Sequence, residues 1–389
     1  MKKAIKVMLV PNNVQRTRLM KFAGAARFAY NWALDKEKKN YEKGGKLIPE
    51  SKLRKEFTNL RHDKDYNWLL NISNNVTKQA IKDLCKAYKN FFEKLAKEPK
   101  FKSKRKSQPK FYQDAYKIQF SETHIKLEGL AKSRKLNKQK LNWIRLAERG
   151  RIPVNAKYMN PRITSDGINW WISVVVEYEN NEEILSEEGI GIDVGIKHLA
   201  VCSDKYIYDN INKTTKIRKL EKRKKRLQRS VSRSYEKNKK GGSYCKTKNI
   251  IKKEKLLFEL NHRLRNIREN HSHQTTSEIV NRNPKFICIE DLNVSGMMKN
   301  KHLAKAIQEQ RFFTFKQQLL YKCESKGIKV IIADRFYPSS KKCSCCGKIK
   351  KDLKLSQREY RCECGNVIDR DYQASLNLKK YGEEFLMKN

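Results

Sequence analysis

Apolar residues in the second half of the chain occur in short runs that are separated by long polar stretches. Runs of this length predict buried strands, whereas apolar positions that recur at helical spacing between them predict helices. The predicted strands are 189–194, 199–203, 205–209, 285–290 and 328–334, and the predicted helices run through 213–282 and 303–326. With a last helix that begins near residue 369, this order indicates a mixed α/β domain.

The first half of the chain has a different pattern. A strand at 2–10 precedes two amphipathic helices at 14–43 and 74–97, and residues 111–180 are predicted to form β structure. An Asp166-Gly167 turn lies ahead of an alternating strand in that β segment. The fold class expected for the whole chain is therefore α/β and α+β multidomain.

The charge of the chain identifies the class of partner. There are 88 Lys and Arg against 42 Asp and Glu, which gives a formal net charge of +46. A surface with so much positive charge is typical of proteins that bind nucleic acid. The basic residues concentrate between Lys213 and Arg268, in two predicted helices joined at Gly241-Gly242. A second basic run at 97–110 contains two prolines and is predicted to be a loop. Each run alone would fit a solvated face, but together they favour a nucleic-acid channel.

No apolar run approaches the length that spans a bilayer, and the opening MKKAIKVMLVPNN lacks the apolar core of a signal peptide. We therefore expect a cytoplasmic protein without a membrane segment.

Cysteines near the C-terminus have the spacing of a metal site. Cys343 and Cys346 form C-x-x-C-G, and Cys362 and Cys364 form C-x-C-G. Four thiolates in two pairs suit a structural Zn²⁺ in a zinc ribbon. The second pair is one residue tighter than usual and Cys345 is a fifth thiol, so the ligand set stays open, with the first four preferred. The alternative is a run of reduced or disulfide-bonded cysteines.

Three acids stand where a sheet presents its functional edge. Asp193 and Glu290 each end an apolar strand, and Asp371 lies at the start of the last helix, just after Asp369. Such a cluster is unfavourable unless divalent cations neutralise it. Two Mg²⁺ ions about 4 Å apart, with Mn²⁺ as a possible substitute, would serve phosphodiester hydrolysis. Taken singly, each acid could equally be a turn residue or a helix cap.

The same residues carry a family resemblance. GIDVG, ICIED, FYPSSKKCSCCG, LSQREYRCECG and DRDYQASLNL are similar to the signature blocks of the TnpB family, RNA-guided nucleases encoded by insertion sequences, and of the related compact type V CRISPR effectors. The resemblance extends from about Gly189 to Leu378 in family order. Gln373 and Ser375 replace the Asn and Ala of the family pattern DRD-x-N-A-A, which leaves the fine geometry of the site open.

The resemblance implies a prokaryotic, nucleoid-associated protein with an RNase H-like (RuvC) nuclease domain interrupted by the zinc ribbon. In front of it would lie a β-barrel-like wedge domain with an inserted helical recognition lobe. Asp193, Glu290 and Asp371 match the acids of the three RuvC motifs. The implied segments are a first wedge strand at 1–12, the recognition lobe at 13–110, the wedge β segment at 111–185, the RuvC-like domain at 186–340, the zinc ribbon at 341–367 and the end of the RuvC-like domain at 368–389.

The hypothesis is an RNA-guided DNA endonuclease that works as a monomeric ribonucleoprotein with a guide RNA and double-stranded DNA next to a short motif. The alternatives are a compact CRISPR effector, a strand-transfer transposase, a non-catalytic RNA-guided repressor, and a zinc-ribbon nucleic-acid-binding protein without activity. Four residues of the first long helix are candidates for nucleic-acid contact, although a core role fits Trp32 at least as well: Arg27, Tyr30, Asn31 and Trp32.

Overall fold

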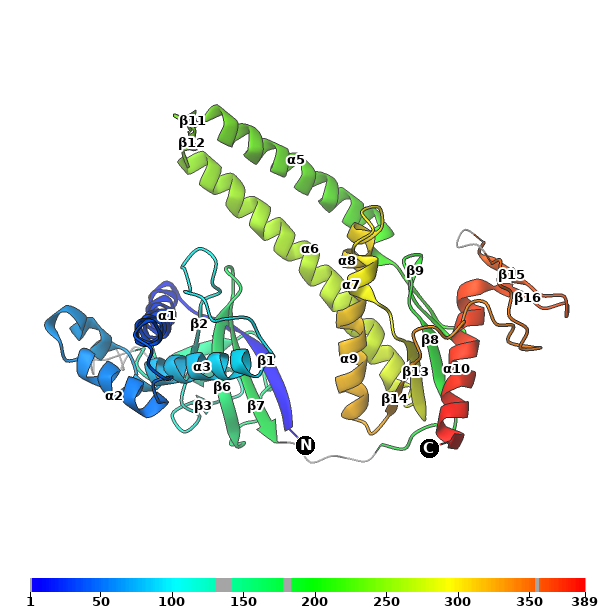
Figure 1. Cartoon of the computed structure of the whole chain (residues 1–389), viewed down its shortest axis with the longest axis horizontal. Helices are drawn as coiled ribbons and strands as arrows, with labels where there is room; N and C mark the ends of the chain where they lie inside the picture. Colours follow the sequence, from blue (N-terminus) through cyan, green and yellow to red (C-terminus); the bar gives the residue numbers. More distant parts are fainter. Residues whose placement is uncertain (1, 131–140, 178–182, 354–356, 389) are drawn as a thin grey trace. The chain divides into compact units, whose positions relative to one another are not determined.

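The computed structural model describes residues 2–130, 141–177, 183–353 and 357–388 (Figure 1). The chain divides into two compact units, Met1–Glu179 and Asn180–Asn389, and each has its own core.

Unit 1 is built on a seven-stranded sheet in the order β2-β6-β7-β1-β5-β4-β3. The predicted strand at 2–10 is confirmed as β1, which pairs antiparallel with β7 along its length and with β5 at its end. The first residues of the chain thus share a sheet with strands more than a hundred residues away. The strands are β1 (Lys2–Val10), β2 (Lys110–Tyr112), β3 (Gln119–Phe120), β4 (His124–Lys126), β5 (Trp143–Leu146), β6 (Tyr158–Ser165) and β7 (Trp170–Glu177).

Helices follow β1 in unit 1. The structure has α1 (Asn13–Glu42), α2 (Glu50–Leu60), the short 3₁₀ helix η1 (Lys64–Asn71) and α3 (Asn74–Phe92). Asn12 and Gln15 form a reciprocal capping box at the start of α1, which satisfies N–H groups that the helix leaves free. The prediction of a helix to residue 97 is wrong at its end: α3 stops at Phe92, and Lys94 takes a left-handed conformation with φ 59°.

Unit 2 contains a five-stranded sheet in the order β10-β9-β8-β13-β14. β8 and β14 pair parallel with β13, whereas β8, β9 and β10 pair antiparallel in succession. All five strands predicted for this half of the chain are confirmed to within two residues. They are β8 (Ile190–Asp193), β9 (His198–Cys202), β10 (Ile207–Asp209), β13 (Phe286–Glu290) and β14 (Lys329–Ala333).

Helices cover both faces of this sheet (Figure 1). On one face Ile192 and Ile289 pack with Ile279 of α6 (Lys248–Asn281) and Phe315 of α9 (Phe312–Glu324). On the other face, Leu378 of α10 (Arg370–Lys388) packs with a smaller cluster that includes Phe286, Cys288 and Ile331. Strands with apolar side chains on both faces are the pattern of a covered, partly parallel sheet.

The predicted helical segment 213–282 is a long hairpin. The short η2 (Ile211–Lys213) leads into α5 (Thr215–Lys237), which runs antiparallel to α6, and β11 (Lys239–Lys240) and β12 (Ser243–Tyr244) form the tip (Figure 1). Gly241 and Gly242 make the turn there with φ values of 51° and 82°, a conformation that glycine adopts without strain.

The segment 303–326 corrects a prediction of one helix. It contains two helices, α8 (Ala304–Gln310) and α9, because Arg311 between them is left-handed with φ 57°. Ile307, Phe312 and Phe315 of these helices lie in the core, since each is at most 4% exposed. A one-turn helix, α7 (Val294–Met297), precedes them, and β15 (Glu359–Arg361) pairs with β16 (Val367–Asp369) near the cysteines.

Within the described residues, no helix combines the length and apolar character needed to cross a membrane.

Candidate active site and cysteine cluster

Asp193 and Glu290 lie side by side at one edge of the unit 2 sheet. Each is the last residue of its strand, and β8 and β13 are parallel neighbours in which Ile192 is paired with Ile289. The next residue on each strand is therefore an acid, at the carboxyl end where parallel strands present functional groups.

Asp371 comes to the same edge because α10 packs closely on β8. A Cβ at Gly191 would lie 2.0 Å from the carbonyl oxygen of Ser375 and 2.3 Å from the Lys379 nitrogen, so only glycine lets the helix approach. A Cβ on Gly382, one turn further along α10, would instead meet the ring of Phe286 at the start of β13. α10 therefore runs opposite to β8, and its first turn lies at the carboxyl end of the strand.

Asp369 caps the start of α10. Its Oδ1 accepts hydrogen bonds from the backbone nitrogens of Asp371 and Tyr372, at 2.9 and 3.1 Å. Asp369 Oδ1 is therefore the oxygen that caps α10, and the Asp371 side chain is not needed for capping.

The electrostatics of the edge are those of crowded carboxylates. Burial, followed by the charges of Glu290 and Asp371, raises the pKa of Asp193 well above its usual range. Burial also raises the pKa of Glu290, against a hydrogen bond from the Ser339 hydroxyl that lowers it. Two acids with raised pKa values at the end of a sheet are typical of a functional site.

The neighbouring Asp291 belongs to a different environment. It accepts from Lys316 at 3.1 Å and from Arg335 at 2.5 Å, and these hydrogen bonds lower the pKa of its carboxyl. Two cations neutralise Asp291, so it forms structural ion pairs. Glu290 is therefore the acid at the end of β13 that is available to bind a metal.

Oxygen donors of this kind are the ligands that Mg²⁺ and Mn²⁺ prefer, so the residues present fit a hard divalent cation. Arg370, 3.5 Å from Asp371, and Arg358, 3.9 Å from it, are the cations that flank the helix end of the site. Across the part of the chain that the structure describes, the set of metal-ligating atoms that all lie within 4.8 Å of one another is the cysteine set. The oxygens of the three carboxylates therefore do not all lie within that distance of one another.

The four preferred cysteines do converge. The sulfurs of Cys343 and Cys364 are 3.7 Å apart and those of Cys346 and Cys362 are 3.6 Å apart. Tetrahedral ligation with Zn–S bonds of about 2.3 Å places sulfurs about 3.8 Å apart, so the cluster could bind zinc. The fifth thiol, Cys345, is exposed and lies outside this set.

Within the cluster, the surroundings of Cys343 favour its thiolate, whereas hydrogen bonds with the neighbouring cysteines raise the pKa of Cys364 to about 12. Burial opposes ionisation of Cys343, but N–H donors, among them the backbone of Cys346 and the side chain of Asn366, lower its pKa to about 6.

The loop after Asp193 is held by two buried amides. Gln310 Nε2 donates to the Gly195 carbonyl at 2.9 Å, and Asn210 Nδ2 donates to the Ile196 carbonyl at 2.7 Å. Both amides are at most 7% exposed, so these bonds form away from competing water. The position of the loop is thereby tied to α8 and η2.

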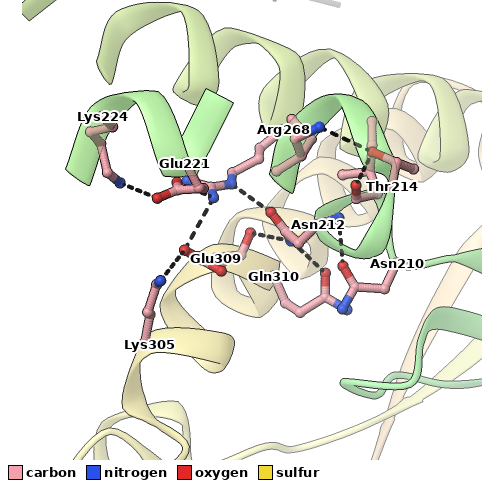
Figure 2. A network of polar contacts seen from close by, with 11 residues as sticks. Asn210, Asn212, Thr214, Glu221, Lys224, Arg268, Lys305, Glu309 and Gln310 are labelled. Carbon is pink, nitrogen blue, oxygen red and sulfur yellow. Dashed lines mark hydrogen bonds and ion pairs between the residues drawn. The ribbon is translucent and has the colours of Figure 1, made fainter. Parts of the chain in front are cut away.

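Figure 2 shows how the same region anchors the basic hairpin. Arg268 of α6 lies 3.0 Å from Glu221 of α5 and 3.1 Å from Glu309 of α8, and it donates to Asn212 at 2.7 Å. Lys224 adds a 2.7 Å ion pair to Glu221. One arginine thus joins the base of the hairpin to the helix that supports the loop after Asp193.

The hairpin presents a cationic surface. Three arginines and one acid line a groove between its helices, together with three leucines and a serine: Arg223, Arg226, Arg263, Glu259, Leu227, Leu256, Leu260 and Ser230. The acids of α5 are occupied, Glu221 by Arg268 and Glu236 by the Tyr244 hydroxyl at 3.0 Å. Eleven basic residues at 213–237 are exposed: Lys213, Lys216, Arg218, Lys219, Lys222, Arg223, Lys225, Arg226, Arg229, Arg233 and Lys237.

Three of the four N-terminal candidates have structural contacts. Trp32 packs edge-on against Phe57 with centroids 5.1 Å apart, which fits the core role. Asn31 hydrogen-bonds both backbone groups of Lys102, at 2.8 and 2.9 Å, and the Lys102 ammonium lies over the Tyr30 ring. Arg27 lines a pocket with Asp83 and Lys102. A role of any of them in nucleic-acid contact stays a prediction.

Residue patterns alone missed the side chains that support the acids. Ser339 donates to Glu290, while Gln373 and Asn377 of α10 bond the backbone before the cysteines. A signal was present in the sequence, because Gln373 and Asn377 are polar residues four positions apart on the face of the helix that also carries Ala374 and Leu378.

Three family models match the chain. They are described as "Helix-turn-helix domain", over residues 1–46, "Probable transposase", over residues 173–301, and "Cas12f1-like, TNB domain", over residues 312–378. In this chain the first matched region forms β1 and α1, and the third includes the cysteine cluster and Asp371.

Relatives match the chain over nearly its whole length. The protein named "Putative RNA-guided DNA endonuclease InsQ", from Escherichia coli K12, is 30% identical over 400 residues, which cover 98% of this chain and 93% of that protein. A "Putative RNA-guided DNA endonuclease" from Streptomyces pristinaespiralis is 27% identical and covers 98% and 89%.

The fold also matches a solved structure. The protein in the "Cryo-EM structure of the Cas12f1-sgRNA-target DNA complex" superposes with a TM-score of 0.54 at 14% identity, over 97% of this chain and 98% of that one. At this identity the match concerns the fold alone. The family follows from the full-length relatives: the chain belongs to the TnpB-like family of RNA-guided DNA endonucleases.

Proposed function

We propose that this protein is an RNA-guided DNA endonuclease whose catalytic residues are Asp193, Glu290 and Asp371. The single observation that supports the catalytic assignment is the juxtaposition of Asp193 and Glu290 on neighbouring parallel strands, with the first turn of α10 brought to the same edge. Family membership supports the class of reaction, the guide RNA and the DNA substrate.

The three carboxylates would hold Mg²⁺, or Mn²⁺ in its place, by their oxygens. When bound, two such ions supply an activated water and stabilise the leaving 3′ oxygen of an in-line phosphodiester displacement. Asp193 would be one of the metal ligands, and because burial and the charges of Glu290 and Asp371 raise its pKa, it would release a proton as a cation binds. Gln310 and Asn210 would keep the loop after Asp193 in place through the reaction.

The strand order β10-β9-β8-β13-β14, with three antiparallel strands followed by parallel ones, supports a RuvC-like, RNase H-type assignment for this domain. We further propose that the four-cysteine cluster with β15 and β16 is a zinc ribbon inserted between β14 and α10. The sheet and helices of unit 1 would be the wedge domain and the recognition lobe, with the boundaries expected from the sequence.

The nucleic acid would meet the exposed face of the α5–α6 hairpin. Lysines and arginines dominate that face and the acids of α5 are already paired, so its field attracts phosphates. Guide RNA and target DNA both offer such phosphates, and base pairing between the two would supply the sequence specificity.

Strand transfer is the second candidate, because the model described as "Probable transposase" matches residues 173–301 and the same acids could serve that reaction. Dependence on RNA separates the two, since strand transfer does not need a guide. A non-catalytic repressor is the weaker alternative because all three acids are present.

The test uses protein purified together with its RNA, supercoiled plasmid that carries the matching target, and Mg²⁺. The proposal expects RNA-dependent cleavage that Asp193→Ala abolishes while RNA binding remains. Cleavage that survives Asp193→Ala would remove the catalytic assignment, and cleavage that survives removal of the RNA would remove the guide.

A further inference from the structure

A chain of hydrogen bonds connects Glu290 to the cysteine cluster through buried side chains. The Ser339 hydroxyl donates to Glu290 Oε1, and the Ser339 carbonyl accepts from Asn377 Nδ2 at 2.7 Å. Asn377 Nδ2 also donates to the Lys342 carbonyl at 2.6 Å. Lys342 is the residue before Cys343, so the first cysteine of the cluster and Glu290 share one polar support on α10.

Gln373 closes the same arrangement from the previous turn of α10. Its Nε2 donates to the Lys342 carbonyl at 2.8 Å, and its Oε1 accepts from Ser344 at 2.8 Å and from Asn366 at 3.2 Å. Asn366 in turn donates to the Cys343 sulfur at 3.4 Å. Gln373 therefore holds residues on both sides of the first cysteine and one residue of the second cysteine loop.

These side chains are removed from water. Gln373 is 0% exposed, Asn377 1%, Ser339 4% and Cys343 1%. A buried amide that lost its partners would leave unpaired donors and carbonyls, at a cost of about 1–3 kcal/mol each. These hydrogen bonds therefore hold the side chains in one arrangement. A displacement of the cysteine cluster would also displace Ser339.

We propose that Ser339, Asn377 and Gln373 are positioning residues that align Glu290 for metal binding by tying it to the backbone of the cysteine cluster. On this inference the cluster, once loaded with zinc, also sets the geometry of the nuclease site. The inference rests on the proposed function, because it takes Glu290 as a ligand of the catalytic metal. Residues that orient metal ligands in this way typically change metal affinity about 10–100-fold when they are removed.

The test measures Mn²⁺ affinity by electron paramagnetic resonance on the full-length protein, with zinc content determined on the same samples. The site is defined as the Mn²⁺ binding that Asp193→Asn removes. Ser339→Ala, which deletes one hydroxyl, and Asn377→Ala are expected to weaken this binding about 10-fold or more while zinc stays stoichiometric. Cys364→Ser, at an exposed ligand position, is expected to lose zinc and to weaken Mn²⁺ binding as well.

Gln318→Ala is the matched control. Gln318 is another buried amide of unit 2, 3% exposed, and accepts from Ser272 at 2.7 Å, but it has no hydrogen bond in the chain from Glu290 to the cysteines. It should leave Mn²⁺ affinity within about twofold of the wild type, because its loss costs stability without moving Glu290. Equal weakening by Gln318→Ala would show a general effect of instability and overturn the inference.

The remaining outcomes distinguish failure of the positioning role from failure of the proposed endonuclease function. Mn²⁺ binding that needs Asp193 but is unchanged in Ser339→Ala would overturn the positioning role and leave the endonuclease proposal standing. If Asp193→Asn leaves Mn²⁺ binding unchanged, the proposed metal site is wrong, and the positioning role is wrong with it. If Asn377→Ala does not fold, Ser339→Ala decides, since the Ser339 carbonyl keeps its bond to Asn377.

Discussion

Asp193 and Glu290 are neighbours because Ile192 and Ile289, the residues before them, are paired across two parallel strands. Neither acid has a lysine or arginine within ion-pair distance among the described residues, in contrast to Asp291, which has two. The sheet therefore presents two adjacent carboxylates whose charge the protein leaves for another group to neutralise. This is an arrangement that costs stability until a cation binds.

Asp193→Asn should stabilise the metal-free protein. Because the folded pKa of Asp193 is raised, the stability that this group contributes is present at low pH and is lost as pH rises through that folded value. The asparagine side chain cannot ionise, so the variant does not lose this stability at neutral pH. Its melting temperature should then exceed the wild-type value, by about 2–4 °C for each kcal/mol of unfolding free energy that the wild type loses. The difference should shrink as the pH is lowered. A wild type that melts higher than the variant in chelator at neutral pH would contradict it.

Magnesium affinity should depend on pH in the direction set by the same groups. The pKa values of Asp193 and Glu290 are both raised, so cation binding must displace protons from carboxyls that hold them at higher pH than usual. The Mg²⁺ concentration that gives half-maximal cleavage should fall as the pH rises from about 5.5 to about 8. A value that stays constant over this range would contradict the electrostatic account.

Gly191→Ala should disrupt the packing of α10 on β8. The added Cβ would lie 2.0 Å from the Ser375 carbonyl, where helix backbone cannot move without moving Asp371. We expect a loss of about 3 kcal/mol or more in urea unfolding, the upper range for overpacked cores. Gly195→Ala is the control, since its Cβ would have its nearest neighbour at 3.5 Å. Equal stabilities of the two variants would show that the close approach of α10 is not as described.

Zinc binding should depend on the four converging cysteines and not on the fifth. Cys362→Ser should reduce the zinc content measured by mass spectrometry, since its sulfur lies 3.6 Å from that of Cys346 inside the set. Cys345→Ser should retain one zinc per chain because Cys345 is exposed and outside the set. Loss of zinc in Cys345→Ser with retention in Cys362→Ser would reverse the ligand assignment.

Arg268→Ala should loosen the base of the basic hairpin. It would leave Glu221 and Glu309, each 18% exposed, without the cation that joins them, at a cost of about 3 kcal/mol. Lys305→Ala removes a second cation from Glu309, but Lys305 is 72% exposed and its 3.8 Å pair should contribute less than about 0.5 kcal/mol. Thermal unfolding at matched ionic strength compares the two. Equal effects would show that the network in Figure 2 does not anchor the hairpin.

The strands that end in an acid could be predicted from the local sequence pattern. An apolar run that ends in an acid specifies both a buried strand and a carboxylate at its end, so β8 with Asp193 and β13 with Glu290 could be located from sequence. The convergence of the thiols of Cys343, Cys346, Cys362 and Cys364 followed from their spacing.

Breaks in helices without glycine or proline were not predictable in the same way. Arg311 and Lys94 adopt left-handed conformations that usually favour glycine, so their residue types give no signal of a break. The contact of Ser339 with Glu290 spans 49 residues, and that of Gln373 with Lys342 spans 31. Hydrogen bonds between such distant residues exist only once the sheet and α10 are assembled, so no spacing rule reveals them.

The most direct test of the central claim is to map the cut in plasmid DNA with two guide RNAs of different target segments. The account predicts that the cut moves with the guide, requires Mg²⁺, and disappears in Asp193→Ala, Glu290→Ala and Asp371→Ala while guide binding remains. A cut that stays at one position with either guide, or that persists when any of these three carboxylates is removed, would contradict it.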